Sequence, residues 1–135
     1  MRSGERRDRP GQDGFTLLEL ITVVAIIGVL VAIALPNYRV AIMQSKEAVL
    51  KEDLYRFRDL IDQYYSDKGR YPASLQALVE DGYLRRIPSD PFTNAPDWTE
   101  VPAEPEPDSV EEPGIYDVHS ASELTSLSGQ AYNEW

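Results

Sequence analysis

The sequence predicts an α+β protein in which one long N-terminal α-helix packs on a small C-terminal antiparallel β-sheet. Three observations indicate this fold class. A membrane-length apolar run occupies Phe15–Leu35, an amphipathic stripe extends from Leu50 to Tyr64, and short strand-like segments begin at Trp98. With 135 residues, the chain has room for one modest domain and one membrane anchor.

Residues 1–14 form a charged leader with four arginines against three acids, a net charge of +1. Pro10, Gly11 and Gly14 disfavour a helix in this segment. Arginines ahead of an apolar run keep the N-terminus of a membrane protein in the cytoplasm and send the C-terminal part outward. We therefore expect residues 37–135 to form a globular domain on the outer side of the membrane.

The apolar run Phe15–Leu35 has 21 residues and a single charge, Glu19. A helix of that length spans roughly 31 Å, close to the hydrocarbon core of a bilayer. Gly28 is a weak point in such a helix. Pro36 kinks or ends it, because proline lacks a main-chain N–H donor. The sequence therefore predicts a transmembrane helix over residues 15–36.

Two processing schemes for this run are compatible with the residues alone. A secretory signal would be cut at Ala32-Ile33-Ala34, although the run is longer than an ordinary signal core and contains Glu19. Cleavage after Gly14 would instead leave the apolar helix on the mature chain. The choice decides whether the mature protein keeps a membrane anchor.

The second scheme agrees with a family resemblance. The stretch Gly14-Phe15-Thr16-Leu17-Leu18-Glu19, followed by an aliphatic run and a proline, resembles the start of type IV pilins and pseudopilins. The resemblance implies a pilin-like fold and a membrane peptidase that cuts after Gly14 and methylates the new N-terminal residue, Phe15. Gly28 and Pro36 stand where that family has a helix-loosening glycine and proline.

Glu19 is an acid near the start of the apolar run, where a charge is costly in lipid. In a helix it shares a face with Phe15, because residues i and i+4 are neighbours. After cleavage Phe15 carries a positive amine, and the resemblance implies that this amine pairs with Glu19 of another subunit during filament assembly. The alternative is a Glu19 side chain that reaches the membrane surface near the helix end.

The helix is expected to continue past Pro36 to about Lys68. Apolar residues recur at intervals of three and four, as on one face of an amphipathic helix: Leu50, Leu54, Phe57, Ile61 and Tyr64. The pairs Glu47–Lys51 and Glu52–Arg56 have the i,i+4 spacing of favourable ion pairs. A base followed by Gly69 is a typical helix end.

A short helix is predicted over residues 74–81, with Leu75, Leu78 and Val79 facing inward and Gly82 ending it. The prolines that follow predict a turn from this helix into a sheet. Three stretches around the helix resemble the major pseudopilin of type II secretion, the G family: Tyr71-Pro72, Gly82-Tyr83-Leu84 and Ile87-Pro88-Ser89-Asp90-Pro91-Phe92.

Three later segments have the composition of short strands: Trp98–Val101, Gly114–Val118 and Ala131–Trp135. Between the first two, residues 102–114 contain four prolines and five acids, which predicts an exposed loop. This loop is either a subunit-specific contact surface or a tolerated insertion.

The composition narrows the possible functions. The chain has no cysteine, so disulfides, thiol nucleophiles and cysteine-type zinc sites are excluded. The formal net charge is −10, and residues 87–135 contain eleven acids without a lysine or arginine. Such a surface repels phosphates, so nucleic acid is not an expected partner. The acidic half serves solubility or attracts a basic partner or divalent cations.

The G-family resemblance also implies a calcium site, because those pseudopilins typically hold calcium in an aspartate-rich C-terminal loop. Four residues match the ending of that pattern: Asp117, Ser120, Gly129 and Trp135. The aspartate run itself is missing. Since calcium takes six to eight oxygens, Asp117, Glu123 and Glu134 are candidate ligands only if the loop folds back. We expect hydrogen bonds from serine and threonine to replace the ion, and no other cofactor.

Catalysis is not expected from these residues. The chain has one histidine, no cysteine and no glycine-rich phosphate loop. Asp117, His119 and Ser120 are too close in sequence for a productive catalytic triad. The protein is therefore expected to be a substrate of a prepilin peptidase and methyltransferase, and not an enzyme.

The predicted function is that of a structural subunit of a pseudopilus that drives protein export through the type II secretion system. Expected partners are copies of the same chain in a helical filament, minor pseudopilins, the peptidase/methyltransferase and the inner-membrane assembly platform. The expected location is the bacterial inner membrane, crossed once, with the globular domain in the periplasm.

Two alternative functions remain open from the sequence. One is a type IV pilus pilin for adhesion, motility or DNA uptake. The absence of cysteine favours the pseudopilin over this pilin, since many pilins close their C-terminal region with a disulfide. The other is a membrane-anchored or secreted binding module that uses the acidic C-terminal half.

Overall fold

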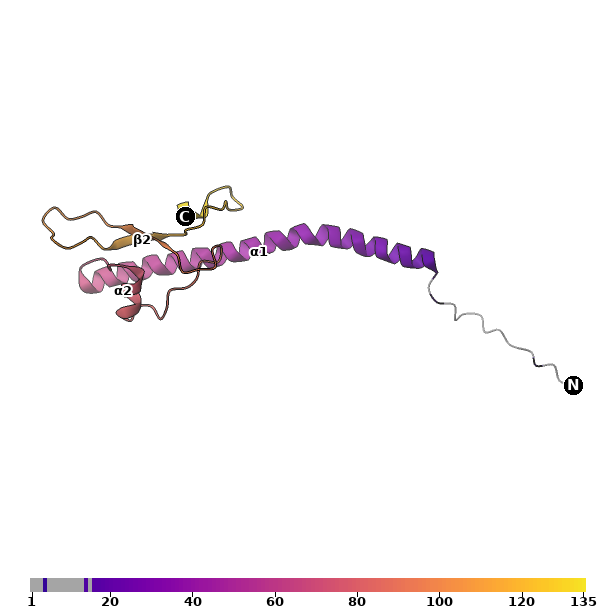
Figure 1. The fold of residues 1–135 in the computed structure, drawn as a ribbon, viewed down its shortest axis with the longest axis horizontal. Helices are drawn as coiled ribbons and strands as arrows, with labels where there is room; N and C mark the ends of the chain where they lie inside the picture. Colours follow the sequence, from indigo (N-terminus) through magenta and orange to yellow (C-terminus); the bar gives the residue numbers. More distant parts are fainter. Residues whose placement is uncertain (1–3, 5–13, 15) are drawn as a thin grey trace. The chain divides into compact units, whose positions relative to one another are not determined.

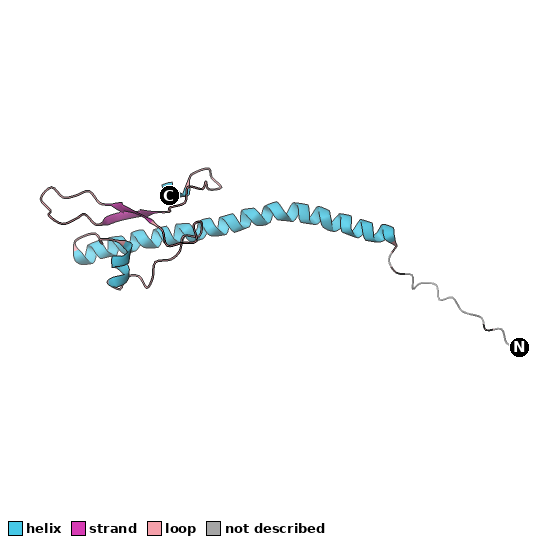
Figure 2. Ribbon diagram, in the orientation of Figure 1, coloured by secondary structure: helices cyan, strands magenta, loops and turns pink. Residues whose placement is uncertain are grey.

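The computed structural model describes residue 4, residue 14 and residues 16–135. Its elements, in chain order, are α1 (Leu17–Lys68), α2 (Leu75–Glu80), β1 (Thr99–Pro102), β2 (Ile115–His119) and the 3-10 helix η1 (Tyr132–Glu134) (Figure 1). The chain divides into two compact units, residues 1–40 and residues 41–135. The long helix and small antiparallel sheet confirm the predicted α+β, pilin-like fold (Figure 2).

The first unit contains the apolar start of α1. Thr16 caps this helix, because its Oγ1 accepts a hydrogen bond from the N–H of Glu19 at 3.2 Å. The helix continues through Pro36, as predicted. It is long and apolar enough to cross a membrane. Phe15, where the helix was expected to begin, lies outside the described residues.

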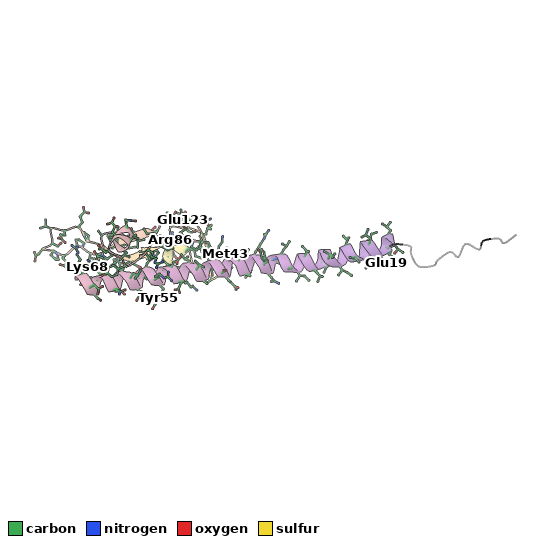
Figure 3. All side chains as sticks on the ribbon, turned by 90° about the horizontal axis from the view of Figure 1, so that it is seen from below. Glu19, Met43, Tyr55, Lys68, Arg86 and Glu123 are labelled. Carbon is green, nitrogen blue, oxygen red and sulfur yellow. The ribbon has the colours of Figure 1, made fainter. Side chains whose placement is uncertain are left out.

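The second unit is organised around the amphipathic part of α1. The predicted stripe is confirmed, since all five of its side chains are buried: Leu50, Leu54, Phe57, Ile61 and Tyr64. They pack in one core with residues from the other elements: Leu75 and Leu78 of α2, Ile115 and Val118 of β2, Trp98 and Tyr132. Tyr55 lies on the opposite side of the helix and points away from this core (Figure 3).

Both helix ends in this unit follow the predicted glycine signals. Gly69 has a φ of +69° and donates its N–H to the carbonyl of Tyr65 at 2.8 Å, which ends α1. Gly82 has a φ of +82° and follows α2 in the same way. Each glycine adopts a backbone conformation that a side chain would strain.

α2 is a short helix of 6 residues whose N-terminus is held by two side chains. Ser74 is its N-cap, and Ser74 Oγ accepts from the N–H of Ala77 at 3.2 Å. The N–H of Leu75 donates to Glu100 Oε1 at 2.9 Å, so β1 supplies the second cap. Val79, predicted to face inward, is only half-buried.

The sheet has two antiparallel strands, and β1 and β2 agree with the first two predicted strands to within one residue. Thr99 pairs with His119 and Val101 with Asp117, after which the register shifts so that Pro102 faces Ile115. The shift falls where β1 reaches its proline, which has no N–H for the ladder.

The third predicted strand, Ala131–Trp135, is wrong. Residues 132–134 form η1, and Ala131 makes only an isolated bridge with Thr125. The reason is the packing of two aromatic rings, because Tyr132 and Trp135 meet edge to face at 5.1 Å. Residues i and i+3 share a side in a 3-10 turn, whereas in a strand they point to opposite faces.

One of the two predicted ion pairs along α1 is also wrong. Arg56 lies 3.8 Å from Glu52, as the spacing suggested. Glu47 does not pair with Lys51. Its Oε1 accepts from the N–H of Leu127 and from the Tyr132 hydroxyl, both at 2.8 Å, while Lys51 Nζ lies 4.9 Å from the centre of the Trp135 ring. Tertiary partners therefore override the local pairing.

Candidate functional site

The predicted processing and assembly motif lies at the start of α1. Gly14 and Glu19 are described, whereas Phe15, the residue expected to be methylated, lies outside the described residues. Glu19 is exposed in the first turn of the helix (Figure 3). A carboxylate is favoured there by the positive end of the helix dipole. Cleavage after Gly14 and the pairing of Glu19 with a Phe15 amine stay predictions.

The apolar part of α1 exposes its side chains on every side. All residues from Leu17 to Val40 are exposed, including Leu18 at 74% and Leu30 at 61%. A helix that is apolar all round is stable in lipid or inside a helix bundle, and not in water. This segment therefore needs a membrane or neighbouring subunits around it.

Gly28 and Pro36 weaken this helix for intrinsic reasons. A Cβ added at Gly28 would meet no atom within 4 Å among the described residues, so packing does not require a glycine there. A glycine in a helix interior costs about 1 kcal/mol relative to alanine. Pro36 removes one N–H from the hydrogen-bond ladder of α1. Both residues fit the helix-loosening role, which the structure does not test.

The candidate calcium ligand Asp117 is already engaged by a positive side chain. Its Oδ1 accepts from Arg58 Nε at 2.7 Å and from the N–H of Val118 at 2.8 Å. Its Oδ2 lies 3.5 Å from His119 Nε2. Arg58 comes from α1 and Asp117 from β2, so the pair ties the helix to the sheet.

The other two calcium candidates do not join Asp117. Glu123 and Glu134 are both exposed. Across residues 16–135, which are fully described, there is no group of three or more acids or histidines placed to hold a metal ion. Calcium requires several carboxylates converging on one point, so the residues present do not fit it.

The catalytic-triad arrangement of Asp117, His119 and Ser120 is not formed. His119 Nδ1 lies 2.6 Å from the main-chain oxygen of Trp135. The hydroxyl of Ser120 donates to the carboxylate of Asp90. The histidine and the serine thus have separate structural partners.

A buried polar network holds the segment after β2. Asp90 and Ser120 are both fully buried, and Asp90 Oδ1 also accepts from the N–H of Phe92 at 2.8 Å. Ser120 Oγ accepts from the N–H of Ser122 at 3.1 Å, and Ser122 Oγ accepts from the N–H of Leu124 at 3.3 Å. The serine hydrogen bonds expected in this segment are present.

The acidic loop between β1 and β2 is exposed, as predicted. The N–H of Ala103 donates to the carbonyl of Gly114 at 2.7 Å and closes its base. Several of its glutamates line a cavity of about 490 Å³ together with Tyr65 and Tyr71. Whether the loop contacts another subunit stays a prediction.

Sequence reasoning missed two residues that organise this unit, Arg58 and Glu47. Both lie beside the buried stripe of α1 and reach the C-terminal segment. The available signal was their spacing, since Glu47, Leu54, Arg58 and Ile61 recur at helical intervals along one row.

The family match and the similar proteins agree with one another. Residues 9–35 match the family described as the prokaryotic N-terminal methylation motif. The chain is similar to type II secretion system core protein G of Escherichia coli K12, with 34% identity over 130 residues that cover 82% of this chain and 81% of the relative.

Two further relatives carry the same description. The core protein G of Pseudomonas aeruginosa is 35% identical over 64% of this chain and 72% of its own length. That of Klebsiella michiganensis is 33% identical over 62% of this chain and 70% of its own length. No solved structure matches this chain.

Proposed function

The chain belongs to the family of type II secretion system core protein G, and on that premise we propose that it is cleaved after Gly14, methylated at Phe15 and polymerised into a pseudopilus. The family is that of the major pseudopilin, which is structural and not enzymatic, in agreement with the expectation from composition. One observation carries the proposal. The residues that match the methylation motif, 9–35, run into a helix whose residues 17–40 are all exposed and mostly apolar.

The proposed layout follows from that helix. Residues 1–14 are the leader, residues 15–36 the transmembrane and assembly helix, and residues 37–135 the periplasmic domain. The arginines of the leader support this orientation. Membership of the family implies partners from the secretion system. We assign these as further copies of the chain, minor pseudopilins, the prepilin peptidase/methyltransferase and the inner-membrane platform.

The proposed driving force for assembly is neutralisation of Glu19. A lone carboxylate in the centre of a membrane costs about 2.5–3.5 kcal/mol on insertion scales, which is the upper limit for Glu19 near the helix start. Pairing with the Phe15 amine of a neighbour removes that cost, and the exposed apolar side chains of residues 17–40 pack together in the same step. The exposed face of α1 in the second unit, which includes Tyr55 and Val49, offers further surface to neighbours.

Two measurements test the proposal. Mass spectrometry of the mature chain is expected to find N-methylated Phe15 at the N-terminus. A chain that starts at Leu35 would contradict the proposal and favour a secreted binding module.

The second measurement is the filament yield of Glu19→Ala, determined by shearing and pelleting. We expect normal membrane insertion and processing, but at least a tenfold lower yield, because about 1.4 kcal/mol corresponds to tenfold. Glu52→Ala is the matched control, since Glu52 is an exposed acid on the same helix whose pair with Arg56 is worth little. Equal yields of the two variants would refute the role of Glu19.

A further inference from the structure

The guanidinium of Arg58 donates hydrogen bonds to three oxygens from the C-terminal part of the chain. Arg58 Nε donates to Asp117 Oδ1 at 2.7 Å, and the NH2 nitrogen (Nη2) donates to the main-chain oxygens of Trp135 at 2.9 Å and Val118 at 3.3 Å. A side-chain carboxylate and main-chain oxygens are among the oxygen types that calcium takes in proteins. In this chain a side chain of α1 binds them instead.

From this geometry we infer that the Arg58 side chain supplies the positive charge that binds the oxygens of the C-terminal segment. We infer from this that the domain folds without calcium. The resemblance to the G-family pseudopilins implied a calcium ion in that region. Here the planar guanidinium offers five donors in a fixed arrangement, so a single side chain can satisfy several oxygens at once.

The surroundings of Asp117 also exclude a divalent ion. Its Oδ1 is shared between Arg58 and the N–H of Val118, and its Oδ2 faces His119. The guanidinium 2.7 Å from the Asp117 carboxylate repels a second cation. Glu123 and Glu134 are exposed, and neither joins a metal-binding cluster within residues 16–135. The site therefore already contains its positive charge.

The contacts of Arg58 hold distant parts of the domain together, as a bound ion would. They join α1 to residues 59, 60 and 77 positions further along the chain. Trp135 has two further contacts. Its main-chain oxygen lies beside His119 Nδ1, and Lys51 Nζ lies over its ring. Loss of the guanidinium leaves three oxygens without their shared donor.

The test is thermal unfolding of the full chain in detergent, followed by tryptophan fluorescence and near-UV circular dichroism. For the native sequence we expect the same Tm with calcium chloride and with excess EDTA. Arg58→Gln is expected to lower the Tm by roughly 5–15 °C. Arg56→Gln is the matched control, because Arg56 lies on the same helix, is 58% exposed and forms a solvent-exposed pair with Glu52 at 3.8 Å. The control should leave the Tm nearly unchanged.

Three outcomes would overturn the inference. The first is a clear rise in the Tm of the native chain on adding calcium. The second is a Tm loss in Arg58→Gln no larger than in Arg56→Gln. If Arg58→Gln does not fold, Arg58→Lys replaces it, since lysine keeps the charge but lacks the planar fork. The third overturning outcome is then a Tm of Arg58→Lys equal to that of the native chain.

Discussion

Replacing Asp90 with alanine should destabilise the domain of residues 41–135 by about 2–6 kcal/mol. Asp90 is fully buried, and its carboxylate accepts hydrogen bonds from the N–H of Phe92 and the hydroxyl of Ser120. Alanine removes both acceptors and leaves the buried Ser120 hydroxyl and the part-buried N–H of Phe92 unsatisfied. Each such donor costs about 1–3 kcal/mol.

The loss is large against the stability of the whole domain. A domain of this size is stable by about 5–15 kcal/mol, so Asp90→Ala should remain folded but shift its midpoint clearly. Ser120→Ala leaves the carboxylate without one donor and should cost about 1.5–3 kcal/mol. Because both variants break the same bond, the double variant should cost about 1–3 kcal/mol less than their sum.

The assay is urea unfolding of the full chain in detergent, read by tryptophan fluorescence. Trp98 is a suitable reporter, since its Nε1 donates to the carbonyl of Pro88 at 2.7 Å, two residues from Asp90. Asp97→Ala is the control, an exposed acid of the same loop whose carboxylate accepts a solvent-exposed hydrogen bond from the Thr93 hydroxyl, and should change stability by less than about 1 kcal/mol. The reasoning fails if Asp90→Ala behaves like this control, or if the two single losses simply add.

Two further predictions concern a glycine and a tyrosine of the same domain. Gly114→Ala should lower the Tm by roughly 10 °C or more, measured by circular dichroism, because the new Cβ would lie 2.5 Å from the carbonyl oxygen of Tyr71 and 2.6 Å from that of Pro72. Pro113→Ala, at an exposed neighbour, is the control, and equal Tm values would contradict the clash. For Tyr132, burial and then the hydrogen bond to Glu47 raise the pKa to about 12 from 10.0, so the folded state favours the neutral phenol. Its stabilising contribution is complete below pH 10 and is lost as the pH rises towards 12. The free energy of unfolding, measured across this pH range, should fall less steeply in Tyr132→Phe than in the native chain. The remaining fall is due to Tyr64 and Tyr83, because their pKa values are also raised. Identical slopes in the two proteins would refute this.

The features that the sequence predicted correctly are local ones. The buried stripe of α1 follows from helical periodicity, and the ends at Gly69 and Gly82 follow from backbone freedom that glycine alone has. The methylation motif was recognisable because its residues are contiguous. Each of these signals is contained within a few turns of the chain.

The features that sequence reasoning missed depend on distant partners. Glu47 was assigned to Lys51 four residues away, but it binds Leu127 and Tyr132 instead. Neither side of that contact is visible in a local window. The last predicted strand failed for the same reason, because the packing of Tyr132 and Trp135 overrides the β-propensity of that segment.

The contacts of Glu47 and Arg58 impose an order on folding. Their partners Leu127, Tyr132 and Trp135 lie 77–85 residues further along the chain, so residues 127–135 close onto a helix that is synthesised much earlier. Until Trp135 is in place, the stripe from Leu50 to Tyr64 lacks part of its cover. Long-range closure of this kind is slow, and a chain that lacks these last contacts exposes apolar surface. If the domain is exported as proposed, it can complete its fold only after all of residues 41–135 have crossed the membrane.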